Sequence, residues 1–261
     1  MEKSLLVYGQ FLLLSLALSN SAKADLAINT DDKAKKMVEK SEAHTRGESL
    51  QAEINMTVHT GDTSRNLSFR TWLIGKDKAV IKILSPAKDR DTGNLRLEMN
   101  LWQYLPNVDR VVKIPPSMML QSWMGSDFTN DDLVKSSSLS RDYTHKIEKS
   151  ESLAEVNAVK IICTPKPDAP VTWGKVILWL RETDSVPLKQ EFYSEANELI
   201  KVMEGSEIKT FGSHIIPTKL TMSTVKKPGA KTVLEYRTIA FDQKLDEKIF
   251  TQDYIRKPVK N

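Results

Sequence analysis

The sequence predicts a mainly β protein built on one large antiparallel sheet, with one solvated face and one apolar face. Apolar and polar residues alternate with a period of two along many short segments, as in half-buried antiparallel strands. Turn signals such as Gly61-Asp62 and Pro228-Gly229 separate these segments, which favours a sandwich or barrel over βαβ units. Helical patterns are scarce, so the apolar face of the sheet has few elements to cover it.

The first residues have the pattern of a secretory signal peptide. Lys3 is followed by an apolar run from Leu5 to Leu18, and the next polar stretch ends in Ala22-Lys23-Ala24, a small-x-small cleavage site. The apolar run is shorter than the roughly 20 residues that a helix needs to cross a bilayer. We expect residues 1–24 to export the chain to the periplasm and residues 25–261 to form a single domain. The alternative is an N-terminal anchor helix.

The mature chain is expected to begin with one helix and to continue in strands. Asp31–Ala43 reads as a surface helix, because Asp31 and Asp32 suit the positive end of the helix dipole and Gly47 follows its end. The expected strands are Ala52–His59, Asn66–Ile74, Ala79–Leu84, Asn94–Leu101, Tyr143–Glu148, Val156–Cys163, Val176–Arg181, Leu188–Ser194, Leu199–Glu204, Lys219–Val225 and Thr232–Phe241.

The segment from Pro115 to Lys135 is the candidate cover for the apolar face. Pro115-Pro116 ends an extended stretch, a short helix is expected up to Gly125, and a second helical turn at Asn130–Val134. Its apolar residues are Met118, Met119, Leu120, Trp123 and Met124. Methionine repacks easily and is frequent at binding surfaces that accept several partners. The residues alone leave two interpretations open: a lid over a ligand, or core packing under a loop.

The composition excludes several classes of protein. With 40% hydrophobic and 28% charged residues, the chain is neither disordered nor a membrane bundle. The net charge is only +4 and both signs are interspersed, whereas a nucleic-acid binder should show a basic stripe. The basic tail from Arg256 to Lys260 is short, and we expect it to be solvated. The single cysteine, Cys163, lies in an apolar stretch and is expected to be a buried thiol rather than a nucleophile.

Motifs for catalysis, metal binding or cofactor binding are not found. The histidines are His44, His59, His145 and His214. They are isolated in the sequence and lack the spacing of metal ligands, and the chain has no nucleophile elbow and no phosphate-binding loop. Asp127, Asp131 and Asp132 could act as paired carboxylates, but their place at a helix start favours capping. We therefore expect no catalytic residues, no metal and no cofactor.

One stretch, from Asp91 to Leu133, carries a specific series of motifs. An aromatic strand of the form W-x-Y-x-P is followed by a basic residue, an I-P pair and a G-S-D-F block with a later acidic residue and leucine. The residues concerned are Trp102, Tyr104, Pro106, Arg110, Ile114, Pro115, Gly125, Ser126, Asp127, Phe128, Asp132 and Leu133. This stretch resembles the exported outer-membrane lipoprotein-sorting-like family, whose fold is that of the LolA and LolB lipoprotein carriers.

The resemblance implies an incomplete, strongly curved antiparallel β-barrel with a short helical lid over its concave apolar side and acyl chains bound between the two. It favours the lid interpretation, with Pro115, Pro116 and Gly125 as the ends or hinge of the lid. The expected cavity wall consists of Leu67, Phe69, Leu95, Leu97 and Met99, with Trp102 and Tyr104 near its rim.

Two functions from different classes follow. The first is a periplasmic carrier for a lipid, a lipoprotein acyl chain or another hydrophobic ligand, received from an inner-membrane transporter and passed to an outer-membrane receiver. The alternative is an adaptor subunit of an inner-membrane export system, without cargo of its own. An enzyme acting on a hydrophobic substrate would require a cluster of perturbed titratable groups, which the sequence does not show.

Overall fold

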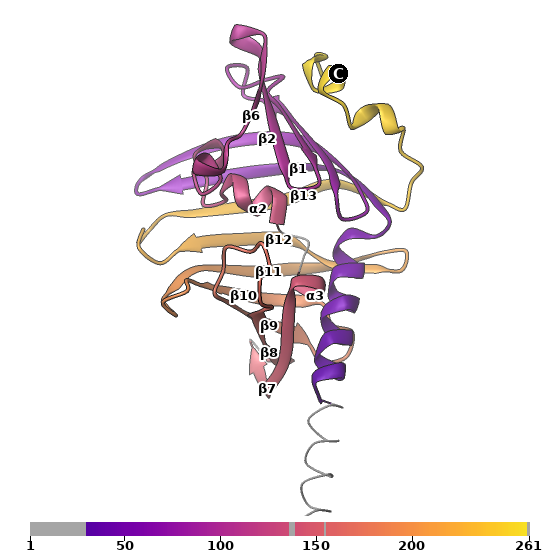
Figure 1. Cartoon of the computed structure of the whole chain (residues 1–261), viewed down its shortest axis with the longest axis vertical. Coiled ribbons are helices and arrows are strands. Elements are labelled where there is room, and N and C mark those ends of the chain that lie inside the picture. Colours follow the sequence, from indigo (N-terminus) through magenta and orange to yellow (C-terminus); the bar gives the residue numbers. More distant parts are fainter. Residues whose placement is uncertain (1–29, 136–138, 154, 260–261) are drawn as a thin grey trace, which may run out of the picture.

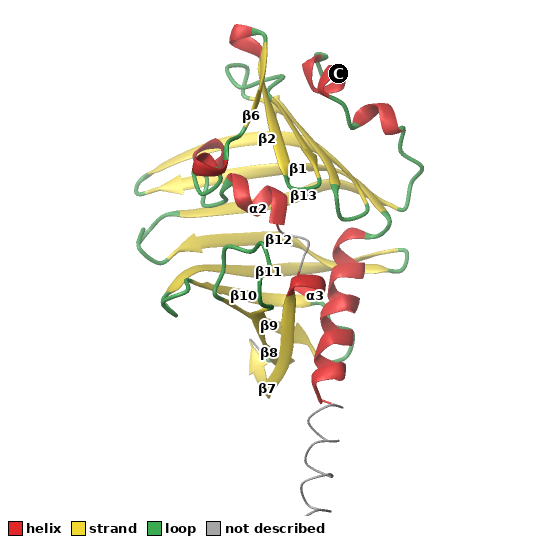
Figure 2. Cartoon of the chain, viewed as in Figure 1, coloured by secondary structure: helices red, strands yellow, loops and turns green. Residues whose placement is uncertain are grey.

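The computed structural model describes residues 30–135, 139–153 and 155–259. Its sheet joins 13 strands in the order β6-β5-β4-β3-β2-β1-β13-β12-β11-β10-β9-β8-β7, and the two edges do not pair. All neighbouring strands are antiparallel. The mainly β class and the curved, unclosed sheet are therefore confirmed (Figures 1 and 2). The expected signal peptide, residues 1–24, lies outside the described residues.

The strands divide into two groups of consecutive neighbours. The first group is β1 (Ser49–Thr60), β2 (Thr63–Ile74), β3 (Lys78–Ser85), β4 (Gly93–Leu97), β5 (Asn100–Leu105) and β6 (Arg110–Lys113). The second group is β7 (Tyr143–Leu153), β8 (Val156–Pro165), β9 (Lys175–Arg181), β10 (Pro187–Tyr193), β11 (Leu199–Phe211), β12 (His214–Thr224) and β13 (Lys231–Phe241). Pairing of β1 with β13 joins the two groups into one sheet.

Among the described residues the helical elements are few, and only the N-terminal helix is longer than two turns. An N-terminal helix spans residues 30–46, and α2 (Asn130–Lys135), α3 (Leu139–Asp142) and α4 (Gln252–Arg256) follow. Single 3-10 turns are η1 (Pro106–Val108), η2 (Pro116–Met118), η3 (Trp123–Gly125) and η4 (Glu247–Ile249). Within the described residues no helix is long and apolar enough to span a membrane.

The connection between β6 and β7 crosses the sheet for a topological reason. These two strands follow one another in sequence but lie at opposite edges. Residues 114–142 must therefore run from one edge to the other, and the described parts of this connection lie over the concave face (Figure 1). The connection contains the segment that the sequence predicted as a lid.

The N-terminal helix covers the concave face of the second group of strands. Ala34, Met37 and Val38 share one side of the helix and are buried against Val159 and Ile161 on β8. Gly47 has a φ of +61° just after the helix, the left-handed conformation that commonly ends helices. Cys163 belongs to the same core with no exposed surface, as expected for a buried thiol.

The C-terminal segment covers the opposite, convex face of the first group of strands. Phe250 and Ile255 are buried against Trp72 on β2 and Val80 on β3. Gly93 on β4 lies so close that a Cβ there would stand 2.8 Å from the Cβ of Ile255. The far end of the chain lies outside the sheet, away from the N-terminal helix (Figure 1).

Buried hydrogen bonds hold this C-terminal segment in place. The ammonium group of Lys82 donates to the backbone oxygens of Asp91, Ile255 and Lys257 at 2.9, 2.5 and 2.9 Å. The backbone N–H of Val259 donates to a carboxylate oxygen of Asp91 at 2.6 Å. The expectation of a fully solvated tail was wrong for the backbone up to Val259, although the side chain of Lys257 is exposed.

Two local features differ from the sequence prediction. The alternating run Asn94–Leu101 is a tight hairpin rather than one strand, because Glu98 adopts a φ of 53° and β4 turns back into β5. The short helix expected before Gly125 is replaced by the two turns η2 and η3. The left-handed conformation of Met124, with a φ of 51°, is incompatible with a regular helix there.

Candidate functional site

Two adjoining hollows lie on the concave face, between the sheet, the N-terminal helix and the connection that crosses the sheet. Their volumes are about 230 Å³ and about 310 Å³. Pockets for small molecules measure about 300–1,000 Å³, so the pair has the dimensions of a ligand site. The residues that line both hollows are Thr45, Phe128, Asp132, Leu139, Pro187, Gln190, Met203, Leu220 and Tyr236.

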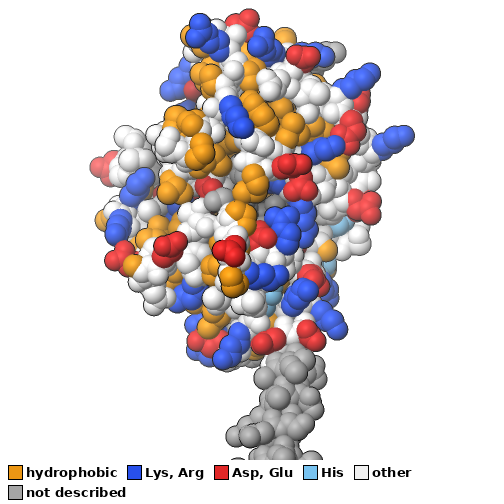
Figure 3. Space-filling model, in the orientation of Figure 1, with side chains coloured by type: hydrophobic (Ala, Val, Ile, Leu, Met, Phe, Trp, Pro, Cys, Tyr) orange, Lys and Arg blue, Asp and Glu red, His pale blue; other side chains and the backbone are white. Residues whose placement is uncertain are grey.

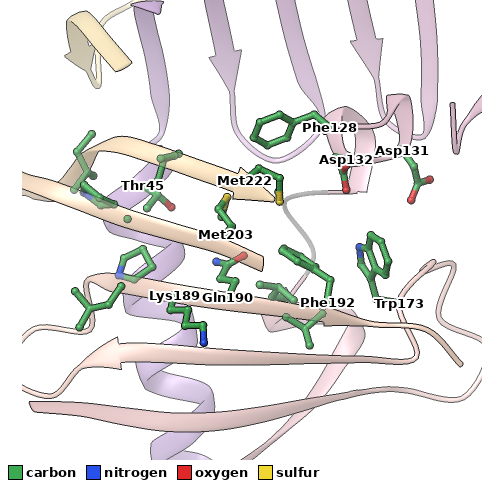
Figure 4. Close-up of a pocket in the computed structure, with 18 of the residues that line it drawn as sticks. Thr45, Phe128, Asp131, Asp132, Trp173, Lys189, Gln190, Phe192, Met203 and Met222 are labelled. Carbon is green, nitrogen blue, oxygen red and sulfur yellow. The ribbon is translucent and has the colours of Figure 1, made fainter. Parts of the chain in front are cut away.

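The first hollow is formed by the second group of strands. Phe192 on β10, Met203 on β11 and Met222 on β12 lie along its wall, and Trp173 from the β8–β9 loop lies beside Phe192 (Figure 4). The rings of Trp173 and Phe192 are 5.3 Å apart between centroids. Thioether and aromatic side chains give this wall an apolar and adaptable surface.

The second hollow is formed by the first group of strands and the crossing connection. Ile54, Phe69 and Leu73 face it from β1 and β2. Trp123 of the connection meets Phe69 edge to face at 5.6 Å, and its indole N–H donates to the side-chain oxygen of Asn94 at 3.2 Å. The buried indole is therefore fixed by both its ring and its polar atom.

Acidic side chains of the connection attach it to the sheet. Asp132 forms a 2.8 Å ion pair with Lys201 on β11, with only 14% and 6% of the two side chains exposed. Asp127 accepts hydrogen bonds from the hydroxyl groups of Thr224 on β12 and Thr232 on β13, at 2.7 and 2.8 Å. These contacts fix the cover at its centre, over the middle strands.

Two more contacts give the acidic residues local roles. The carboxylate of Asp131, next to Asp132 in the sequence, accepts a hydrogen bond from the hydroxyl of Thr172 in the β8–β9 loop at 2.5 Å. Asp132 also accepts from the backbone N–H of Thr129 at 2.7 Å, just before α2. The carboxylates thus cap the start of α2 and tie it to other elements.

Burial favours the neutral form of three weakly acidic groups at or behind the hollows. Burial raises the pKa of the Tyr143 and Tyr236 phenols, and burial also raises the pKa of the Cys163 thiol behind the first hollow. Among the described residues, no histidine or cysteine lines either hollow, and no cluster of His, Cys, Asp and Glu side chains has the arrangement of a metal site. The arrangement suits non-covalent binding of an apolar group.

The predicted wall and lid residues are divided among three places. Phe69 and Trp123 line the second hollow, and Leu67 and Met124 belong to the core beside it. A second set, Leu95, Leu97, Trp102 and Tyr104, belongs to the core under the C-terminal segment and lines neither hollow. The remaining residues, Met99, Pro115, Pro116, Met118, Met119, Leu120 and Gly125, lie at the surface or in a small core with Leu101 and Ile114 and also line neither hollow.

The cause of this division is the register of β3, β4 and β5. Leu95 stands opposite Val80, on the face that the C-terminal segment covers, so its neighbours Asn94 and Arg96 face the concave side. The turn at Glu98 then places Leu101 opposite Arg96, on the concave side. An uninterrupted strand would have put Leu95 and Leu101 on the same face.

Most of the wall comes from residues that the sequence analysis did not single out. Most of them lie on β10, β11, β12 and β13, on the N-terminal helix and in the β8–β9 loop. The alternation of Leu220 and Met222 on β12 was a signal for a shared face, but nothing in the sequence placed that face beside the lid. In Figure 3, hydrophobic side chains also gather on the outside, over the upper half of the face shown.

Comparison with known proteins agrees with this architecture. A family model described as "-like: Uncharacterized protein" matches residues 75–257. A search among curated proteins found no match. The crystal structure of a DUF1329 family protein from Desulfovibrio piger is similar, with a TM-score of 0.79 and 20% identity, over 87% of this chain and 99% of that one.

Two further solved structures share the fold. One is a putative outer membrane lipoprotein-sorting protein domain from Vibrio parahaemolyticus, with a TM-score of 0.77 and 20% identity, over 87% of this chain and 100% of the other. The second is a LolA superfamily protein from Nitrosomonas europaea, with a TM-score of 0.72 and 24% identity, over 85% and 98% of the two chains. The family model covers most of the chain, so this protein belongs to the family that the model describes, and it has the LolA-like fold of these solved structures.

Proposed function

We propose that the protein is a non-enzymatic carrier or binding protein for a lipid-like ligand, held without covalent bonds in the two hollows. One observation carries this proposal. The concave face presents apolar side chains such as Phe69, Met203 and Leu220 to space that the described chain does not fill. A hydrophobic surface kept open in this way is stabilised when a ligand covers it.

The energetics suit capture of an acyl chain from water. Burial of an acyl chain contributes about 0.8 kcal/mol for each CH₂ group, so a long tail needs no covalent step to be retained. The same energy makes release slow unless the cover moves or a receiver offers an equally apolar site. The ion pair of Asp132 with Lys201 and the bonds of Asp127 are the contacts that such a movement would have to break.

The location and partners form part of the same proposal. The leader pattern at residues 1–24 supports export to the periplasm. An inner-membrane transporter would then supply the ligand and an outer-membrane receiver would take it. The similar structure from Vibrio parahaemolyticus is described as a putative outer membrane lipoprotein-sorting protein domain. We extend to this chain the coarser role of binding a hydrophobic ligand within envelope transport.

The test compares two substitutions in the same cover. Phe128 lines both hollows, whereas Leu120 is 64% exposed and lines neither. Delipidated wild-type protein should bind a fluorescent fatty acid, Phe128→Asp should lose binding, and Leu120→Asp should keep it. Thermal melts establish that both variants fold. Absence of binding by the wild type, together with no lipid in mass spectra of the freshly purified protein, would refute the proposal.

One observation favours the adaptor alternative enough to test it. Val112, Met118 and Leu120 are exposed by 37%, 38% and 64%, close together in sequence around the start of the crossing connection. Docking surfaces are marked by contiguous patches of exposed apolar side chains, and these three residues are the candidates for such a patch. An adaptor without cargo should bind its transporter equally well with Phe128→Asp, and should lose that binding with Leu120→Asp. A carrier predicts instead that Phe128→Asp abolishes transport.

A further inference from the structure

The two hollows meet at a junction that contains polar side chains. The polar residues that line both hollows are Thr45, Asp132, Gln190 and Tyr236. On either side of this junction the walls are mainly apolar, with Phe192 and Met222 in the first hollow and Ile54 and Phe69 in the second. A ligand that extends through both hollows therefore passes polar groups between two apolar regions.

The strand register places two of these residues on opposite sides of the junction. Gln190 on β10 stands opposite Met203 on β11, and Tyr236 on β13 stands opposite Ile54 on β1. The strands β11 and β12 lie between β10 and β13, and Leu220 on β12 lines both hollows as well. A ligand group at the junction is therefore approached by the Gln190 amide from one side and by the Tyr236 hydroxyl from the other.

The other two polar residues of the junction use their polar atoms within the protein. The carboxylate of Asp132 pairs with Lys201 at 2.8 Å and accepts from the backbone N–H of Thr129 at 2.7 Å. The hydroxyl of Thr45 donates to the backbone oxygen of Ser41, one turn earlier in the N-terminal helix, at 3.1 Å. The Asp132 charge and the Thr45 proton are therefore matched before a ligand binds.

Gln190 and Tyr236 differ from them in this respect. Neither the side-chain amide of Gln190 nor the hydroxyl of Tyr236 forms a hydrogen bond within the part of the chain that the structure describes. In Figure 4 the amide of Gln190 lies near Met203 and Phe192, on the side of β10 that faces the hollow. Burial raises the pKa of Tyr236, so its hydroxyl stays protonated at neutral pH and can donate. A ligand that displaced water from these two groups without pairing them would bind less well.

The charged side chains around the hollows are matched by the chain itself. Burial lowers the pKa of Arg46, and the carboxylate of Glu42 opposes this effect. Burial likewise lowers the pKa of Arg96, and Asp77 opposes it. Lys189 forms an ion pair at 2.8 Å and points away from the first hollow (Figure 4). Among the described residues, the groups left to meet a ligand at the junction are therefore uncharged.

We propose that the ligand has an uncharged acyl linkage, an ester or an amide, between two apolar arms. The linkage lies at the junction, where the amide of Gln190 and the hydroxyl of Tyr236 supply its hydrogen bonds, and each hollow holds one arm. This assignment rests on the proposed function and adds the chemical class of its ligand. An unbroken hydrocarbon chain would cover both polar groups without a partner, whereas a central carbonyl group accepts from them.

The experiment measures displacement of N-phenylnaphthylamine, a neutral apolar dye, from the delipidated wild-type protein by two isomeric esters. Octyl octanoate has its ester group in the middle of the molecule, and methyl pentadecanoate has the same atoms with the ester at one end. The end ester must either leave one hollow unfilled or cover the junction with CH₂ groups. Octyl octanoate should therefore displace the dye at a concentration about fivefold lower, the factor that corresponds to one hydrogen bond between neutral groups.

Two double variants test the assignment to residues. Tyr236→Phe removes only a hydroxyl, and Gln190→Met replaces an amide with an apolar chain of similar length. Neither change breaks a hydrogen bond between described residues, so their combination should fold like the wild type, which thermal melts check. This variant should bind the two esters equally. The control combines Gln51→Met with Tyr193→Phe, which remove the same groups from residues that line neither hollow, and it should keep the fivefold preference.

The outcomes separate this inference from the function on which it rests. A preference for octyl octanoate that is present in the wild type and the control, and absent from the variant of Gln190 and Tyr236, supports the central linkage. Failure of the dye and of both esters to bind would overturn the proposed function and this inference together. Equal displacement by the two isomers from the wild type would leave the carrier function standing and overturn the linkage assignment. A preference retained without the Gln190 amide and the Tyr236 hydroxyl would overturn it as well.

Discussion

The two faces of the sheet both present apolar side chains, but the chain covers them to different extents. On the convex side of the first strand group, Phe250 and Ile255 of the C-terminal segment pack onto Trp72 and Leu95 and leave those side chains buried. On the concave side the chain also supplies covers, but two hollows remain beneath them. One sheet therefore has a face closed by its own chain and a face with space for another molecule.

The covers of the two faces are also attached differently. The convex cover is held by a continuous apolar core and by Lys82, whose ammonium group donates to three backbone oxygens. The concave cover is held by Trp123, which packs against Phe69, and at its centre by polar side-chain contacts such as Asp132 with Lys201. Polar contacts can be exchanged for water when the cover lifts, whereas opening the apolar core would expose its surface. This difference suits a permanent cover on one face and a movable one on the other.

The largest expected loss of stability comes from a substitution on the convex face, which the C-terminal segment closes. Ile255 has no exposed surface and packs against Gly93, so Ile255→Ala should lower the free energy of unfolding by about 4 kcal/mol. Urea denaturation measures this loss, with the exposed Val108→Ala as the control that should change little. Ligand affinity in the folded variant should stay that of the wild type. A reduced affinity would contradict the independence of the two faces.

The next largest expected loss of stability comes from breaking the contact that attaches the concave cover to the sheet. Lys201→Met leaves the carboxylate of Asp132 buried without its cation and should cost about 3 kcal/mol of stability. Asp132 keeps its bond from Thr129, which limits the loss. Release of a bound fluorescent fatty acid should also become faster, measured by stopped-flow transfer to vesicles. An unchanged release rate would show that this ion pair does not hold the cover.

A matched truncation on the open face should cost less. Leu220 lines both hollows, and Leu220→Ala removes as many carbons as Ile255→Ala. One side of Leu220 already faces space, so the loss should be only about 1–2 kcal/mol, measured by the same urea denaturation. Equal losses for the two truncations would mean that the faces are packed alike.

The smallest expected effect is on the pH dependence of stability. It concerns His145, which contacts α3 at the end of the concave cover. Burial lowers the pKa of His145, whose Nε2 donates to the backbone oxygen of Leu139 at 2.9 Å. The unfolded chain then takes up a proton at a higher pH than the folded chain. The contribution of His145 to stability is therefore complete above pH 6.5 and is lost as the pH falls through the lowered pKa.

Thermal melts between pH 7 and pH 5 measure this dependence. The wild type should lose more stability on acidification than His145→Gln, which has no proton to take up in this range. His44→Gln is a useful comparison, because burial lowers the pKa of His44 as well. Identical pH profiles for the wild type and His145→Gln would exclude a role for His145.

The sequence predicted the class of fold better than it predicted the face of the sheet to which each side chain points. Alternation along β1, β2 and β13 located those strands, because one side of each is apolar and the other is largely polar. The same rule misled for Leu95 and Leu97. Both faces of the first strand group are covered, so an apolar residue there could belong to either core. The informative residue was the polar one, Arg96, which points into the hollow.

The remaining errors have a common physical cause. The hairpin turn at Glu98 and the left-handed conformation of Met124 occur at residues without a turn preference of their own, so tertiary contacts decide them. The C-terminal segment was expected to be solvated because its outer side chains are basic, while its backbone is held by Lys82 and Asp91. The ion pair of Asp132 and Lys201 joins residues far apart in sequence, which no local pattern reveals.

The central claim is that the concave hollow is space for a ligand, and filling it tests this claim most directly. Fatty-acid binding and urea stability should be measured for Leu220→Trp, with Val80→Trp in the closed convex core as the control. Leu220→Trp should abolish binding at no cost in stability, whereas Val80→Trp should lose about 1–3 kcal/mol through overpacking. Wild-type affinity in Leu220→Trp, or destabilisation as large as that of Val80→Trp, would contradict the account.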